Sequence, residues 1–131
     1  MWRVGAALLL GIVAACGPAR PPEVNRDPLD TGYRGVDTQL LEGDLVRFFV
    51  EIEGPTSEAA LTDYADCAAA QYALIRDYGF ARHVRTTIDE RGGVWRADAV
   101  YTISRTLPNG RRTIDAEVVL AECTESGIPA V

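Results

Sequence analysis

The sequence predicts one small α+β domain, in which a single amphipathic helix packs on a four-stranded, mostly antiparallel sheet in the order β-α-β-β-β. Three observations predict this fold. Apolar and polar residues alternate in several segments, as in strands that are buried on one side. One long segment repeats its apolar residues every three or four positions, as in a helix. Turn sequences rich in glycine, proline and asparagine separate these segments.

The first predicted strand covers residues 45–53, where apolar residues occupy every second position and Gly54-Pro55 ends the alternation. The predicted helix covers residues 57–78, with Thr56 or Ser57 as its cap and Gly79 as its stop. Its expected buried stripe contains Leu61, Tyr64, Ala68, Tyr72 and Ile75. Its expected solvent side contains Asp63, Asp66, Ala70 and Asp77.

Three further strands are predicted at residues 80–90, 94–104 and 112–122. The turns between them are Arg91-Gly92-Gly93 and Pro108-Asn109-Gly110. These strands should form an antiparallel meander. The strand at 45–53 joins them through the helix, so it can run parallel to a neighbour through a right-handed crossover. The order of the strands in the sheet stays open.

The first sixteen residues have the pattern of a secretory signal. A basic residue, Arg3, precedes an apolar run of about ten residues, which is shorter than the roughly 20 that a membrane-spanning helix needs. The run ends in Val13-Ala14-Ala15-Cys16, which resembles the lipobox of bacterial lipoprotein precursors. The resemblance implies cleavage before Cys16, acyl chains on Cys16 and a small envelope lipoprotein of a Gram-negative bacterium. Alternatively, Cys16 is an ordinary thiol after a conventional cleavage site.

The predicted organisation is therefore a signal peptide at 1–15, a lipidated Cys16 with a proline- and glycine-rich tether at 16–35, and one domain at 36–131. The alternative for the tether is a proline-rich docking ligand. Two or more acyl chains hold a protein stably on a membrane, whereas one does so only marginally. Gly17 after the cysteine favours the periplasmic side of the outer membrane in such lipoproteins.

Cys67 and Cys123 remain as a pair once Cys16 is assigned to the lipid. An exported protein meets an oxidising compartment, so the sequence predicts a disulfide between them. Two buried free thiols or a redox-active site are the alternatives.

The sequence nominates no catalytic residue, no metal site and no cofactor. His83 is the only histidine, and no Cys/His cluster has zinc spacing. The formal net charge of −6 comes from 19 acidic and 13 basic residues, which makes nucleic acid an unsuitable partner. The chain is therefore expected to be a non-enzymatic interaction module. A periplasmic small-ligand binder or an enzyme inhibitor is the alternative, and an enzyme ranks third.

A possible docking face for an envelope protein lies on the side of the predicted sheet away from the helix. Period-two alternation sends polar residues there, His83 and Asp98 among them. Phe49, Val100 and Val119 should form its apolar centre, with charged residues at the rim. The simpler alternative is a solvated face with cross-strand charge pairs. The candidate docking residues are Arg47, Phe49, Arg85, Arg96, Val100 and Val119.

Overall fold

A computed structural model describes Gly17 and residues 32–129. The described elements are the strands β1 (Gly32–Leu40) and β2 (Leu45–Glu53), the helix α1 (Glu58–Ile75), the strands β3 (Phe80–Arg91), β4 (Val94–Ser104) and β5 (Thr113–Asp115), and the helix α2 (Ala116–Glu125). The predicted signal peptide, Cys16 and most of the predicted tether lie outside the described residues. Neither helix of residues 32–129 is long and apolar enough to cross a bilayer.

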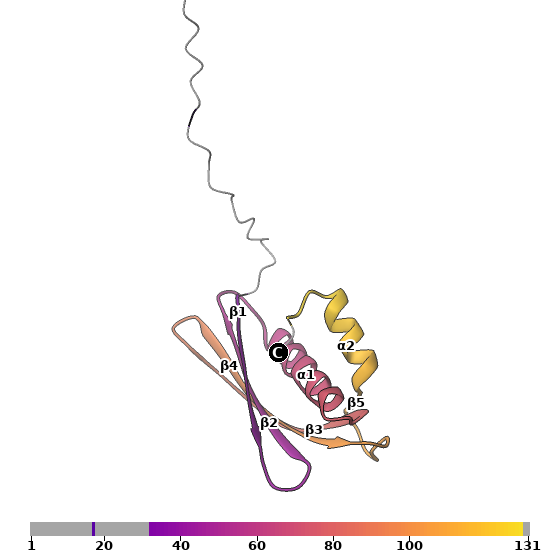
Figure 1. Cartoon of the computed structure of the whole chain (residues 1–131). Coiled ribbons are helices and arrows are strands. Elements are labelled where there is room, and N and C mark those ends of the chain that lie inside the picture. The colour runs from indigo at the N-terminus through magenta and orange to yellow at the C-terminus, as the bar shows by residue number, and fades with distance from the viewer. Residues whose placement is uncertain (1–16, 18–31, 130–131) are drawn as a thin grey trace, which may run out of the picture.

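The strands form one five-stranded antiparallel sheet in the order β1-β2-β4-β3-β5. Both helices lie on the same side of this sheet, with α1 against the strands and α2 beside α1 (Figure 1). The expected α+β class and the antiparallel sheet are confirmed. The expected four strands, single helix and order β-α-β-β-β are wrong, because the elements follow one another as β-β-α-β-β-β-α.

The strand β2 runs parallel to β3 but is not its neighbour, because β4 lies between them and pairs antiparallel with both. The connection from β2 through α1 to β3 therefore skips one strand position. Every neighbouring pair in the sheet is antiparallel, so the parallel neighbour that the sequence allowed for the strand at 45–53 does not occur.

The core lies between α1 and the inner face of the sheet. The largest fully buried side chains are Tyr101, Phe48, Ile52, Leu61 and Val50. Small residues of α1, including Ala65, Ala69 and Ala73, are also fully buried, which lets the helix approach the strands closely. Ser57 caps α1, as the sequence allowed: its hydroxyl accepts a hydrogen bond from the Ala60 amide at 3.1 Å.

The strand β1 was not predicted. It begins at Gly32, inside the segment expected to be a tether, so the folded part starts before residue 36. The strand contains two glycines and few apolar residues, and β1 lies at the edge of the sheet, where most of its residues are exposed. Its one aromatic anchor is Tyr33, whose ring meets the Tyr64 ring edge-on at 4.7 Å between centroids. Edge strands need little apolar surface, so alternation was a weak signal here.

The last predicted strand, at 112–122, is wrong beyond its first residues. Only Thr113–Asp115 pair with β3, and the chain then forms α2. Asp115 caps this helix, since its carboxylate accepts hydrogen bonds from the amides of Glu117 and Val118 at 3.2 and 3.3 Å. The apolar residues of 114–120 fit a period of two, and from Ala116 onward they also fit a helical period. Asp115, a residue type that often caps helices, is the signal in the sequence that favours a helix over a strand here.

The second helix changes the environment of α1. Ala70 was expected to face solvent, but it is fully buried, because α2 packs along that side of α1. Asp66, expected on the same wet side, is only partly exposed. In contrast Ile75, expected in the buried stripe, is 69% exposed at the end of the helix.

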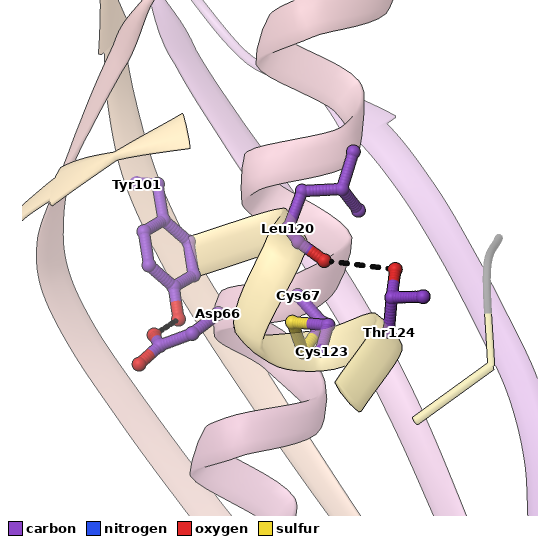
Figure 2. The surroundings of a disulfide bond; sticks show 6 residues. All are labelled: Asp66, Cys67, Tyr101, Leu120, Cys123 and Thr124. Carbon is purple, nitrogen blue, oxygen red and sulfur yellow. Dashed lines mark hydrogen bonds between the residues drawn. A yellow bond between two sulfur atoms is a disulfide. The ribbon is translucent and has the colours of Figure 1, made fainter. Parts of the chain in front are cut away.

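The predicted disulfide between Cys67 and Cys123 is present, with Cα atoms 6.0 Å apart. It joins α1 to α2 instead of joining α1 to the exit of a strand, as Figure 2 shows. Both cysteines are buried. The bond therefore fixes the second helix, which has only Ala116 and Cys123 as buried residues, onto the first.

Candidate functional site

The outer face of the sheet is the side that neither helix contacts. Five of the six candidate docking residues lie there: Arg47, Phe49, Arg85, Arg96 and Val100. On β2 and β4 they alternate with residues of the core, and Arg85 lies there because it pairs with Val100. Strand pairing aligns Val100 with Arg47 on one side and with Arg85 on the other. In the neighbouring row, Phe49 is aligned with Asp98.

The charged residues of this face are paired across strands. Asp98 forms ion pairs with Arg47 at 3.1 Å and with Arg85 at 3.7 Å. Arg96 pairs with Glu51 at 2.7 Å. Since Asp98 is shared by two arginines, this group has two positive charges against one negative charge, a net charge of +1. The charge pairs expected for a solvated face are therefore present, and one arginine charge is in excess within the group of Arg47, Arg85 and Asp98.

The apolar centre of this face is smaller than expected. Phe49 is 39% exposed, and the Arg47 guanidinium lies 5.5 Å from the centre of its ring. Val100 is only 4% exposed, because it lies between Arg47 and Arg85 in the sheet. Val119 is absent from the face, since it belongs to α2 and packs on the core side of the sheet. Phe49 alone therefore supplies an accessible large apolar side chain among the six candidates.

His83 lies on the inner side of the sheet, where the sequence did not place it. A β-bulge at Val84 shifts the register between His83 and Arg85, so His83 is opposite Tyr101 and Arg85 is opposite Val100. The extra residue turns His83 toward the helices. A simple period of two assigns both residues to one face, and nothing in the sequence marks the bulge.

A cavity of about 530 Å³ lies beside His83, between α1, β3, β5 and α2. Sequence reasoning missed it, because its walls depend on the bulge and on the helix α2. Its floor and walls combine apolar, hydroxyl and charged side chains. The lining residues are Thr62, Asp66, His83, Thr86, Arg112, Thr113, Ile114 and Val119.

Asp66 is the carboxylate of this cavity. The Tyr101 hydroxyl donates a hydrogen bond of 2.5 Å to its Oδ1 atom, and Figure 2 shows the two side chains meeting to the left of α2. Burial raises the pKa of Asp66 above its ordinary value. The Tyr101 hydrogen bond and the charges of His83 and Arg112 act in the opposite direction, but they offset only part of the effect of burial. Burial and the Asp66 charge also raise the pKa of Tyr101, which therefore stays protonated as the donor.

His83 is held on three sides. Its Nε2 atom lies 2.6 Å from the Thr86 hydroxyl, its Nδ1 atom lies 3.4 Å from Nη1 of Arg112, and its ring meets Tyr101 edge-on at 5.4 Å. A guanidinium can only donate, so Nδ1 accepts and Nε2 carries the hydrogen that is donated to Thr86. Burial, followed by the charge of Arg112, lowers the pKa of His83, which favours the neutral form of the ring.

The contacts of Thr86, His83 and Arg112 differ from those of a catalytic triad, in which a hydroxyl nucleophile faces a histidine base. In a catalytic triad, the histidine atom facing the hydroxyl accepts its proton, and a carboxylate holds the other ring nitrogen. Here the atom facing Thr86 already carries a hydrogen, and the other nitrogen faces Arg112. Within residues 32–129, no group of histidine, cysteine, aspartate and glutamate side chains is placed to hold a metal ion. The geometry instead suits binding, with a carboxylate and a guanidinium at one cavity.

Comparison with known proteins identifies related sequences. Residues 33–127 match the family described as the YNQ4 C-terminal domain. A protein of Paracoccus denitrificans, named "Uncharacterized 26.9 kDa protein in nqo8 5'region", is 30% identical over 116 residues, which cover 84% of this chain and 45% of that protein. The chain thus spans less than half the length of this relative. No solved structure matches the chain.

Proposed function

We propose that this chain, which belongs to the YNQ4 C-terminal domain family, is a lipid-anchored protein of the cell envelope that docks to another envelope protein through the outer face of its sheet. The proposed role is non-enzymatic. The observation that carries it is the arrangement of both helices on one side, which leaves the other side uncovered in residues 32–129, with Phe49 exposed beside an excess arginine charge.

The anchor is proposed from the first sixteen residues and their lipobox-like end at Cys16. The buried Cys67–Cys123 disulfide supports an exported protein, because such bonds persist in oxidising compartments and are rare in the cytosol. Acyl chains on Cys16 would hold the chain on the periplasmic side of the outer membrane. The segment from Gly17 to β1 would then separate the domain from the bilayer.

The partner is proposed to present a carboxylate next to an apolar side chain. Arg47 and Arg85 share Asp98, so one arginine can pair with a carboxylate from the partner without breaking the existing group. Phe49 lies in the adjacent row, where an apolar partner group would bury its ring. Aromatic and arginine side chains are the residue types that most often dominate binding energy at interfaces.

The anchor is tested by replacing Cys16. A Cys16→Ser protein should leave the membrane fraction and appear in the soluble periplasmic fraction, because it has no thiol for the acyl chain. The matched control is Cys67→Ser with Cys123→Ser, which removes the disulfide, keeps Cys16 and should stay with the membrane. Retention of the Cys16→Ser protein in the membrane fraction would contradict the anchor.

The docking face is tested by photocrosslinking in cells. A photoreactive residue in place of Phe49 should capture one defined protein, while the same residue in place of Val118, which is 53% exposed on α2, should not. Arg85→Ala should abolish the capture, because it removes the excess charge and keeps the Arg47–Asp98 pair. Arg91→Ala, on the same strand and with its side chain 87% exposed, is the control that should capture normally.

Three outcomes argue against this face. A crosslinked product with twice the mass of the chain means that the face binds a second copy and not another protein. Equal capture from Phe49 and Val118, or normal capture in Arg85→Ala, means that the contact does not involve the proposed residues.

A further inference from the structure

The cavity between α1, β3, β5 and α2, which is open to solvent on one side, is lined by one negative and one positive side chain. Asp66 projects into it from α1, and Arg112 borders it just before β5. The two charges interact, since the Arg112 charge lowers the pKa of Asp66. We propose that this cavity binds a free amino acid, with the ligand ammonium group at Asp66 and the ligand carboxylate at Arg112.

Arg112 is available for a carboxylate. No aspartate or glutamate of residues 32–129 lies within ion-pair distance of it, and within these residues its side chain makes only the long contact of 3.4 Å to His83. A guanidinium has five N–H donors in a planar fork that matches a carboxylate. The backbone of Arg112 is held in place, because its carbonyl oxygen accepts a hydrogen bond from the His83 amide at 3.2 Å.

Asp66 is suited to an ammonium group. Tyr101 occupies one lone pair of Oδ1, and no other hydrogen bond reaches the carboxylate from the described side chains. A carboxylate accepts about four hydrogen bonds, so capacity remains on the side that faces the cavity. Its partial burial makes the bare charge costly, and a bound ammonium group would compensate that charge.

The remaining lining suits the side chain of an amino acid. Ile114 is 7% exposed, and Val119 packs on the core beside it, so together they offer apolar surface at the cavity. A volume of about 530 Å³ is within the range of roughly 300–1,000 Å³ that is typical of small-ligand pockets. An amino acid with an aliphatic side chain, such as leucine, therefore fits both the charges and the apolar wall.

This site goes beyond the proposed docking function and does not depend on it. The cavity lies on the helix side of the sheet, whereas the docking face lies on the other side. The chain can therefore dock to its partner without binding an amino acid, and it can bind an amino acid without docking. The tests of the two proposals use different residues and different readouts.

The test is calorimetric titration of the detergent-solubilised full chain with leucine, N-acetyl-leucine and leucinamide. The acetyl compound has no ammonium group and the amide has no carboxylate. Leucine should bind, and each derivative should bind at least about tenfold more weakly, because one charged contact is lost. Asp66→Asn and Arg112→Gln should each weaken leucine binding by a similar factor.

Each variant has a matched control. Arg111→Gln changes the neighbouring exposed arginine, and Glu58→Gln changes an exposed carboxylate in the first turn of α1. Neither residue lines the cavity, so both variants should bind leucine as the unchanged chain does. Nuclear magnetic resonance of the unchanged chain gives a measurement without any variant: leucine should shift the amide signals of Asp66, His83 and Arg112.

The proposal is overturned by any of the following results. The first is the absence of binding by all twenty amino acids at about 10 mM. The second is equal binding of leucine and N-acetyl-leucine, which would mean that a carboxylate alone is recognised. The third is unchanged leucine binding in both Asp66→Asn and Arg112→Gln, or amide shifts that occur only away from the cavity.

Discussion

At the scale of single residues, the hydrogen bond from Tyr101 to Asp66 affects how the cavity responds to pH, although burial has the larger effect on the pKa of Asp66. A hydrogen bond to the charged form of an acid lowers its pKa, so Tyr101 offsets part of the effect of burial on Asp66. Tyr101→Phe should therefore raise the pKa of Asp66 further. It should also lower the free energy of unfolding by about 1–3 kcal/mol, because a partly buried carboxylate loses its donor. A carbon-detected titration of the Asp66 carboxyl and denaturant unfolding measure the two effects.

The control for this substitution is Tyr72→Phe, which removes a hydroxyl that accepts a hydrogen bond from Arg76 at an exposed position of α1. It should leave the pKa of Asp66 unchanged and cost little stability. An unchanged or lowered pKa of Asp66 in Tyr101→Phe would show that the 2.5 Å contact does not stabilise the charged carboxylate.

The raised pKa of Asp66 also predicts the sign of a pH effect on stability. When the folded state has the higher pKa, it binds more protons than the unfolded state at pH values between the two pKa values. The stability from this group is then fully present below the ordinary pKa of 3.8 and falls as the pH rises through the folded pKa. Asp66→Asn removes this dependence. The unfolding free energy of the variant minus that of the unchanged chain should therefore be higher at about pH 8 than at about pH 4. The reverse order would contradict the raised pKa.

At the scale of elements, α2 depends on its disulfide to an unusual degree. The helix buries only Ala116 and Cys123, and the bond closes a loop between residues that are 56 positions apart. The chain-entropy relation assigns about 4 kcal/mol to a loop of this length. Cys67→Ala with Cys123→Ala should lower the unfolding free energy by about 2–4 kcal/mol. Amide exchange in α2 should accelerate before exchange in β2 and β4, and equal acceleration everywhere would show that α2 is not the weak element.

The N-terminal cap of α2 is a second, smaller contribution to the same helix. Asp115→Ala removes the acceptor of the Glu117 and Val118 amides and should cost about 1 kcal/mol in thermal or denaturant unfolding. Asp115→Asn keeps a side-chain oxygen at the cap and should cost much less. Equal losses in the two variants would mean that the charge of Asp115, and not its cap hydrogen bonds, stabilises the helix.

The elements also show what the sequence could and could not predict. The strands β2, β3 and β4 and the helix α1 have clear periodicity and were predicted within a few residues. The segment 114–120 satisfies two periods, so the choice between strand and helix depended on the Asp115 cap. The cavity needed both α2 and the bulge at Val84, and neither follows from alternation. The disulfide was predicted from compartment and cysteine count, which do not depend on the secondary structure around Cys123.

At the scale of the whole molecule, the edge strand β1 decides where the folded domain begins. Gly32 fits closely against β2, since a Cβ atom there would lie 2.7 Å from the Glu53 carbonyl oxygen. Tyr33 packs on Tyr64 of α1 and ties the start of β1 to the core. The domain therefore needs residues that the sequence assigned to a tether, and this assignment can be tested by shortening the chain.

A chain that begins at residue 32 should unfold at the same denaturant concentration as a chain that begins at Gly17. A chain that begins at residue 36 should lose about 2 kcal/mol, because it lacks the Tyr33 ring and the first pairs of β1 with β2. Tyr33→Ala in the chain that begins at residue 32 removes the ring and keeps the strand pairing, so it separates these two contributions to the loss. Equal stability of the chains that begin at 32 and at 36 would place residues 32–35 outside the domain, as the tether prediction had it. A loss confined to the shorter chain would instead make the edge strand part of the fold that carries both the docking face and the cavity.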